Sequence, residues 1–185
     1  PTVHAARSYE HFFSDFGPLN LACVVRYCRM VEDLLKAHPT SRLVHYCSPH
    51  AHRRANSACL LGCFAAIVLG RDARAAYAPF VGARPPLQPY RDAAFGVCTY
   101  PLLVLDVVRG VRRALALGHL DYRGFDVDEY ARLDRIEHGD ISWIIPRKFV
   151  AFSGPLARRR EVEPGLFTLA AEGYVPVFKR RGDAC

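Results

Sequence analysis

The stretch "RLVHYCSPHAHRRANSACLLGCFAAIVLG", residues 42–70, joins three segments of different character. Residues 42–47 are short, apolar and bounded by polar residues, a pattern typical of a buried β-strand. Residues 48–52 form a polar turn, and residues 53–70 form a mostly apolar helix that ends at Gly70. Strand, turn and helix in this order predict a layered structure in which helices pack against a sheet.

The neighbouring segments extend this pattern. Residues 20–37, "NLACVVRYCRMVEDLLKA", carry apolar side chains at helical spacing behind Asn20, a plausible cap. Residues 71–81 and 99–118 predict two further helices, the second ended by Gly118. A short amphipathic helix is expected within residues 125–146, and "KFVAFSGP", residues 148–155, predicts a strand and a turn. The predicted fold class is therefore α/β (α+β), with helices dominating.

Composition limits the class of protein. The chain has 185 residues, of which 51% are hydrophobic, so it can bury at least one good core. It has neither a run of 18 apolar residues nor an apolar signal-peptide stretch in "PTVHAARSYEHFF", so we expect no membrane association and no secretion. Seven scattered cysteines predict reduced intracellular thiols. Because the chain starts without Met and stops just after "YVPVFKRRGDAC", we expect a fragment of a longer protein.

Charge is distributed unevenly along the chain. The net charge is +7, yet residues 121–140 hold seven acids and three arginines, a local charge of −4. The basic residues are spread over several segments and do not alternate with aromatic residues along one stretch. We therefore expect no nucleic-acid partner and regard the acidic segment as the more informative feature.

Cys47 and Arg53 are separated by five residues, the spacing that protein tyrosine phosphatases use. Such a loop places a thiolate at a helix N-terminus, turns backbone N–H groups toward the phosphate and grips it with the arginine. "SPHAH" contains no glycine for the tight cradle, Pro49 removes one donor, and no Ser or Thr follows Arg53. We favour a phosphatase-shaped loop without activity, and catalysis by Cys47 is the alternative.

The same stretch could be written as a zinc site, using His45, Cys47, His50, His52, Cys59 and Cys63. Each residue has a stronger structural interpretation. His45 belongs to the strand-like run, and the other two histidines belong to the polar turn. Cys59 and Cys63 are four residues apart on an apolar helix face, where cysteine packs as a small hydrophobe. We predict no metal and no cofactor.

Five longer runs resemble one family. They are "FFSDFGPLNLACVVRYC", "VHYCSPHAHRRANSACLLG", "PYRDAAFGVCTYPLLVLDVVRGVRRAL", "FDVDEYARLDRIEHGDISWIIPRKFVAFSGP" and "GYVPVFKRRG". Together they resemble, from about residue 9 to residue 182, the N-terminal half of the cell-division-cycle-fourteen (mitotic-exit) dual-specificity protein phosphatases. "DFGPLNLA", "RDAAFG" and "KFVAFSGP" are long and occur in order.

This resemblance implies two tandem phosphatase-like domains joined by a linker helix. It places a non-catalytic dual-specificity-phosphatase-like domain, with a central sheet flanked by helices, at residues 1–120, a linker helix at 121–142 and the truncated start of a second domain at 143–185. The second domain of such proteins carries the His-Cys-x-x-Gly-x-x-Arg loop, which this chain does not contain. The resemblance therefore implies that Cys47 is structural, and that a C-terminal catalytic domain of the same protein is its partner.

The resemblance also implies a substrate. The family removes phosphate from phosphoserine and phosphotyrosine proteins, favours Ser-Pro sites followed by a basic residue, and works in the nucleus and cytoplasm. Its substrate groove is lined by acids of the first domain and the linker, which correspond here to Glu129, Asp134, Glu137 and Asp92. This chain departs from the family by having two arginines in "YARLDR", which predicts a less acidic groove. The alternative is a stand-alone, catalytically inactive phosphatase-like module that binds phosphorylated or basic partners.

Overall fold

The computed structural model describes residues 9, 11, 13–145 and 148–180, and it divides between Phe125 and Asp126 into two compact units. Unit 1, which ends at Phe125, contains the helices α1 (Leu21–Ala37), α2 (Ala51–Ile67), α3 (Ala73–Tyr77) and α4 (Val104–Ala116), with a 3-10 turn η1 (Ala78–Phe80). Unit 2 contains α5 (Val127–Leu133), η2 (Ile136–His138), the strands β1 (Ser142–Ile145), β2 (Phe149–Ala151), β3 (Glu161–Glu163) and β4 (Leu166–Phe167), and α6 (Ala171–Arg180).

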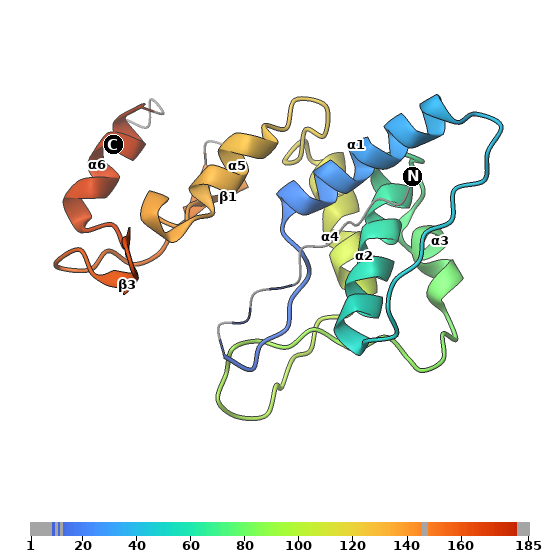
Figure 1. The fold of residues 1–185 in the computed structure, drawn as a ribbon, viewed down its shortest axis with the longest axis horizontal. Coiled ribbons are helices and arrows are strands. Elements are labelled where there is room, and N and C mark those ends of the chain that lie inside the picture. The colour runs from blue at the N-terminus through green and yellow to red at the C-terminus, as the bar shows by residue number, and fades with distance from the viewer. Residues whose placement is uncertain (1–8, 10, 12, 146–147, 181–185) are drawn as a thin grey trace. The chain divides into compact units, whose positions relative to one another are not determined.

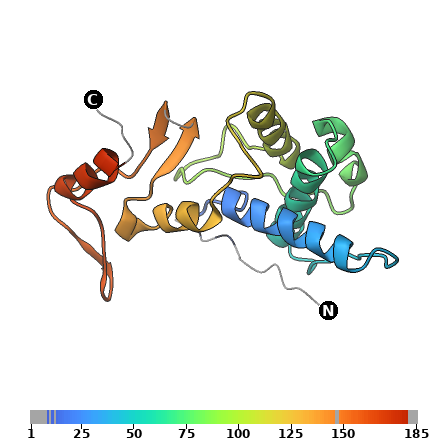
Figure 2. The ribbon, with the colours of Figure 1, turned by 90° about the horizontal axis from the view of Figure 1, so that it is seen from above.

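Helix α2 is the centre of unit 1. It contacts α1, α3 and α4, as Figures 1 and 2 show. More than half of its 17 residues are buried, and its core side chains are the small or apolar ones that the sequence predicted. Gly62 faces α4 closely, because a Cβ placed there would lie 2.9 Å from Val108 Cγ2. The apolar character of α2 on nearly all sides is explained by this burial between three helices.

Local signals in the sequence mark the helix ends correctly. The Asn20 side chain accepts a hydrogen bond from the Cys23 amide at 3.0 Å and so caps α1. Asp72 caps α3 in the same way, through the amides of residues 74 and 75. Gly70 and Gly118 follow α2 and α4 with φ values of 65° and 69°, the left-handed conformation that ends helices.

The strand predicted at residues 42–47 is wrong. These residues form an irregular connection between α1 and α2, and most of them are exposed, including Val44 at 75% and Tyr46 at 70%. An apolar run can favour a strand locally, but a strand forms only when a second segment accepts its backbone hydrogen bonds. In the described part of unit 1 no segment does so; the His45 ring instead contacts Tyr27 of α1 and Ser57 of α2.

The predicted mixed α/β class is confirmed, with a different distribution of strands. The four strands of the described residues all lie in unit 2, as two separate antiparallel pairs, β1–β2 and β3–β4. A central sheet flanked by helices is not formed by the described residues of unit 1, whose sheet-type pairing consists of isolated bridges such as Phe16 with Arg91. The strand predicted within residues 148–155 is confirmed as β2.

Unit 2 has a smaller core. Leu133, Ile141 and Tyr174 are buried together, with Val150, Leu169, Val177 and Phe178 packed against them. The Tyr174 hydroxyl lies 3.1 Å from the Gly139 carbonyl oxygen and 2.9 Å from that of Ser153, so one side chain ties α6 to two loops. Within the described residues, no helix is long and apolar enough to cross a membrane.

Candidate functional site

The loop that carries Cys47 and Arg53 leads directly into α2. His50 is the N-cap residue and makes no side-chain capping bond to the amides of the first turn. Cys47 and Arg53 are both exposed. The Oγ atom of Ser48 is buried without a hydrogen-bond partner. The loop therefore has the cysteine, helix end and arginine of a phosphatase loop in the predicted order, but the cysteine follows an irregular segment and not a strand.

The backbone of this loop differs from a phosphate cradle. A cradle alternates right-handed and left-handed residues so that successive N–H groups converge. None of residues 47–53 has a positive φ, and Pro49 has no N–H. The neighbouring Arg54 points elsewhere, because its guanidinium donates to the Pro85 carbonyl oxygen at 2.6 Å. The geometry supports anion attraction at the helix end better than a closed nucleophilic pocket.

The histidines near this loop fall into two groups. His45 bonds to Tyr27 Oη at 3.0 Å and to the Ser57 hydroxyl, and burial lowers its pKa. His52 lies among rings, with the His50 and His11 centroids 5.2 and 5.7 Å away. Burial and then these two histidines lower the pKa of His52. Among the described residues, no group of three or more histidine, cysteine or acidic side chains is arranged to hold a metal.

The acidic segment lies in the sequence between unit 1 and the strands of unit 2. Asp126 caps α5 by accepting from the amides of residues 128 and 129, at 3.1 and 2.9 Å. Asp121 accepts from the backbone of residues 123 and 124 and closes a turn. Asp121 and Asp126, two of the seven acids, thus stabilise a turn and a helix start, and both residues are exposed to solvent.

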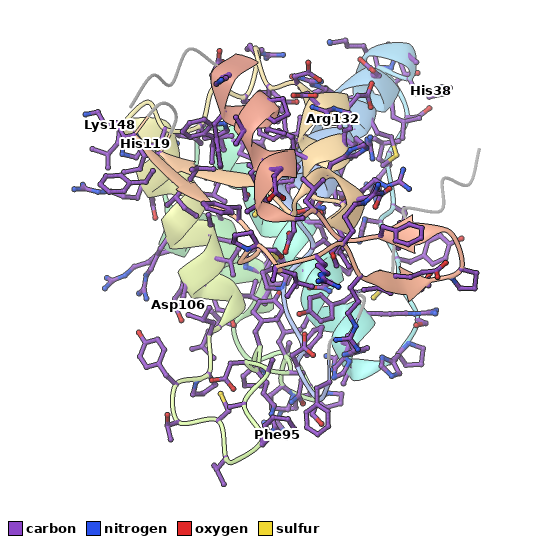
Figure 3. The ribbon with its side chains drawn as sticks, turned by 90° about the vertical axis from the view of Figure 1, so that its left-hand side faces the viewer. His38, Phe95, Asp106, His119, Arg132 and Lys148 are labelled. Carbon is purple, nitrogen blue, oxygen red and sulfur yellow. The ribbon has the colours of Figure 1, made fainter. Side chains whose placement is uncertain are left out.

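Arginines of the segment pair with two of the predicted substrate-binding acids. Arg132 holds Glu129 through a two-pronged contact, with Nε–Oε2 at 2.7 Å and Nη2–Oε1 at 2.9 Å. Arg135 pairs with Glu137 at 2.5 Å. The contact with Glu129 raises the pKa of Arg132. Arg132, labelled on α5 in Figure 3, therefore lowers the negative charge that Glu129 presents.

The structure places the four predicted acids in different units. Glu129, Asp134 and Glu137 lie within a stretch of nine residues in unit 2, where Asp134 is the C-cap of α5. Asp92 lies in unit 1, on an exposed loop, where its Oδ1 accepts from the Ala94 amide at 3.3 Å. The three linker acids therefore belong to one unit and Asp92 to the other.

Comparison with known proteins identifies the family. Residues 2–114 match the family described as dual specificity protein phosphatase, N-terminal half. The chain belongs to this family. It is 46% identical over 175 residues to the human dual specificity protein phosphatase CDC14A, and 37% identical over 159 residues to the tyrosine-protein phosphatase CDC14 homolog of Schizosaccharomyces pombe. These alignments cover 93% and 84% of this chain.

The chain is much shorter than these phosphatases. It spans 29% of the length of human CDC14A and 38% of the length of human dual specificity protein phosphatase CDC14C, to which it is 41% identical over 173 residues. The resemblance deduced from "DFGPLNLA", "RDAAFG" and "KFVAFSGP" is thereby confirmed at the level of the family. The residues described above belong to the N-terminal half of a CDC14-type dual-specificity phosphatase.

Sequence reasoning missed one part of the site. It treated His50 and His52 as members of a polar turn and did not connect them with His11. The structure stacks the His52 ring on Phe16, with centroids 3.9 Å apart and planes within 10°. A sequence signal did exist, since "HFFSDFG" and "HAH" are rich in aromatic rings and histidine. Phe16 and His52 are 36 residues apart, however, and nothing in the sequence indicates that they are in contact.

Proposed function

We propose that this chain is the substrate-recognition half of a dual-specificity protein phosphatase whose phosphoprotein substrates carry Ser-Pro sites followed by a basic residue. The observation that carries the proposal is the cluster of acids at residues 121–140 in a chain whose net charge is +7. Opposite charge at the rim of a binding site raises the association rate and selects between partners. A lysine or arginine after the phosphorylation site is the matching feature of a substrate.

Glu129, Asp134 and Glu137 are the proposed contacts for that basic residue, with Asp92 as a fourth. All three linker acids retain solvent access, and none of them is buried. Asp126 and Asp121 accept hydrogen bonds from backbone amides, so their substitution would change the local fold as well as the charge and would not test recognition alone. The pairing with Arg132 and Arg135 supports a groove that is less acidic than the acid count suggests.

The catalytic step is assigned to a C-terminal domain of the same protein. In this proposal residues 1–120 form the phosphatase-like domain, residues 121–142 the linker and residues 143–185 the start of the catalytic domain. The absence of a positive φ in residues 47–53 supports a non-catalytic role for Cys47 and Arg53. The place of action is proposed to be the nucleus and cytoplasm, as for the phosphatases that the sequence resembles.

The proposal is tested by peptide binding. A fluorescent phosphoserine-proline-x-lysine peptide is titrated with the chain at low salt, beside a peptide with glutamate in place of lysine. We expect the lysine peptide to bind better, and a combined Glu129→Gln, Asp134→Asn and Glu137→Gln variant to lose most of that preference. Glu163→Gln, an exposed acid of β3, is the matched control. Equal binding of both peptides by the chain would contradict the proposal.

Arg132 offers a sharper test in the opposite direction. Replacing it by glutamine removes one positive charge from the Glu129 carboxylate, so the lysine peptide should bind about two- to fivefold more tightly, the range of an exposed ion pair. The control is Arg109→Gln, which releases Asp106 of unit 1 from a similar exposed pair at 3.1 Å. If both arginine variants strengthen binding equally, total charge and not Glu129 decides recognition.

The role of Cys47 is tested separately by activity. Hydrolysis of an aryl phosphate is measured for the chain and for Cys47→Ser, with vanadate as inhibitor. We expect no turnover that depends on Cys47. Vanadate-sensitive turnover that is lost in Cys47→Ser would assign catalysis to the 47–53 loop and would overturn the recognition-only role.

A further inference from the structure

The segment before α1 lies across the start of α2. We define the N-terminal strap as Tyr9, His11 and residues 13–17. Its Phe16 is 3% exposed and stacks on His52, in the first turn of α2. The backbone of Phe16 exchanges two hydrogen bonds with Arg91, at 3.0 and 2.8 Å, and the Gly17 carbonyl accepts from Asn56 at 3.3 Å. The strap therefore covers the helix end to which the 47–53 loop leads.

His52 carries the face-to-face ring contact of this arrangement. The Phe16 ring and the His52 ring are parallel within 10°, a geometry in which the imidazole packs as a flat aromatic surface. Phe16 also packs against Tyr90, at 5.0 Å and a tilted angle. Both contacts lie within unit 1. Because the two rings are in contact, a change in the charge of His52 alters the environment of Phe16 in the strap.

The charges around His52 oppose its protonation. From the strap comes His11, with centroids 5.7 Å apart, and from the helix start comes His50, at 5.2 Å. Arg53 follows in α2, whose N-terminal end carries the positive end of the helix dipole. The guanidinium of Arg91 is directed to the carbonyls of Ala94 and Gly96.

Asp15 is the acid of the strap and faces inward. It is 6% exposed, and its carboxylate accepts from Tyr9 Oη at 2.5 Å and from the Phe13 amide at 2.7 Å. Burial and Asp15 raise the pKa of Tyr9 to about 12, so this phenol stays a donor. The Asp15 carboxylate thus forms hydrogen bonds within the strap. The ionisable side chains whose rings lie next to His52 are those of His11 and His50.

We propose that the N-terminal strap is an acid-sensitive latch, closed over the start of α2 when His52 is neutral and released when His52 is protonated. Protonation places a positive charge against the buried Phe16 ring and at the positive end of α2. A charged imidazolium also loses its preference for the buried Phe16 face because it must be desolvated there. Release exposes the Phe16 ring and the face of His52 on which it stacks.

The sign of the pH effect follows from linkage. The folded pKa of His52 is lowered below its ordinary value near 6.5, so the released state binds more protons than the latched state. The latch is therefore fully closed above about pH 6.5 and weakens as the pH falls from there toward the folded pKa. His45 faces Tyr27 and Ser57, away from these rings, and is not part of the latch.

The latch is tested by NMR on the intact 185-residue chain with labelled histidine, phenylalanine and valine. Between pH 7.5 and 5 we expect His52 to titrate below 6.5, and the Phe16 signals to move with the same midpoint toward those of a free ring. Signals of Val108, in the core of unit 1, should stay unchanged over this range. Phe16 signals that do not follow His52 would overturn the proposal.

Two variants separate charge from structure. His52→Phe keeps a flat ring against Phe16 but cannot be protonated, so the Phe16 response to acid should be lost. His11→Gln removes one neighbour and should raise the pKa of His52 while the stack persists. His38→Gln, at the C-cap of α1 and labelled in Figure 3, is the control and should change neither. An unchanged acid response in both His52→Phe and His11→Gln would exclude the histidine latch.

Discussion

The two compact units reach stability by different means. Unit 1 encloses a helix on three sides, and its largest fully buried side chains include Val25, Val108, Cys28 and Cys63. The core cluster of unit 2 consists of Leu133, Ile141 and Tyr174, and several apolar side chains of this unit are exposed, such as Ile144 and Phe149, each at 63%. Apolar volume therefore stabilises unit 1, whereas unit 2 depends on a few close contacts.

The comparison also separates two kinds of surface. In unit 1 several exposed apolar residues lie on the loop before α4, where Phe95, labelled in Figure 3, is 86% exposed. In unit 2 the surface near α5 is charged, and its arginines and acids pair at short range. A recognition surface built from such exposed pairs tolerates substitution, while a core built around α2 does not.

The largest effect is expected from Val108→Ala in unit 1. Val108 is fully buried against α2, so the change removes two methyl groups and leaves a cavity, at a cost of about 2–4 kcal/mol in the free energy of unfolding. Urea unfolding followed by amide signals of each unit measures this cost separately. Val175→Ala, at a half-exposed position of α6, should change stability by less than about 0.5 kcal/mol. Equal losses for both variants would refute the contrast between the units.

Gly139→Ala is the corresponding test of unit 2. Gly139 has a φ of 100°, and an added Cβ would lie 2.7 Å from Tyr174 Cε1, so we expect a loss of about 1–3 kcal/mol. The loss should appear in the amide signals of unit 2 alone. Gly154→Ala, where nothing lies within 4 Å, is the matched control and should be nearly neutral. A neutral Gly139→Ala would show that unit 2 does not depend on this contact.

Two glycines within helices of unit 1 should respond with opposite signs. Gly62→Ala places its Cβ 2.9 Å from Val108 Cγ2, and crowding should cost about 1 kcal/mol or more. Gly110→Ala in α4 meets no atom within 4 Å and should stabilise the helix by about 0.5–1 kcal/mol. Thermal midpoints report both changes. Two shifts in the same direction would mean that the close approach of α2 and α4 is not limiting.

The smallest effect concerns His45 and pH. Burial lowers its pKa, so the unfolded chain binds the proton more readily and unit 1 should lose stability as the pH falls below about 6.5. We expect His45→Gln to flatten part of this dependence in unit 1 and to leave that of unit 2 unchanged. Stability curves recorded between pH 8 and 5 test this. The same slope in the chain and in His45→Gln would exclude His45 as a contributor.

The helices could be predicted because their signals are local. Asn20, Gly70 and Gly118 act on backbone groups within a few residues, and each lies at or close to the helix end that was expected. The strand at residues 42–47 could not be predicted in the same way, because a strand requires a partner and periodicity describes one segment only. The candidate acids came from the resemblance to the family, and the charge count of residues 121–140 agrees with three of them; none of the four is buried.

The family, the helical elements and the acidic segment can be recognised in the amino-acid sequence alone, because each depends on neighbouring residues or on long ordered motifs. The contacts of His52 with Phe16 and His11, the contact of Tyr174 with Gly139 and the unpaired state of residues 42–47 in the described part of unit 1 depend on the packing of distant segments. These contacts join segments about 35 residues or more apart, and their geometry depends on how the helices pack.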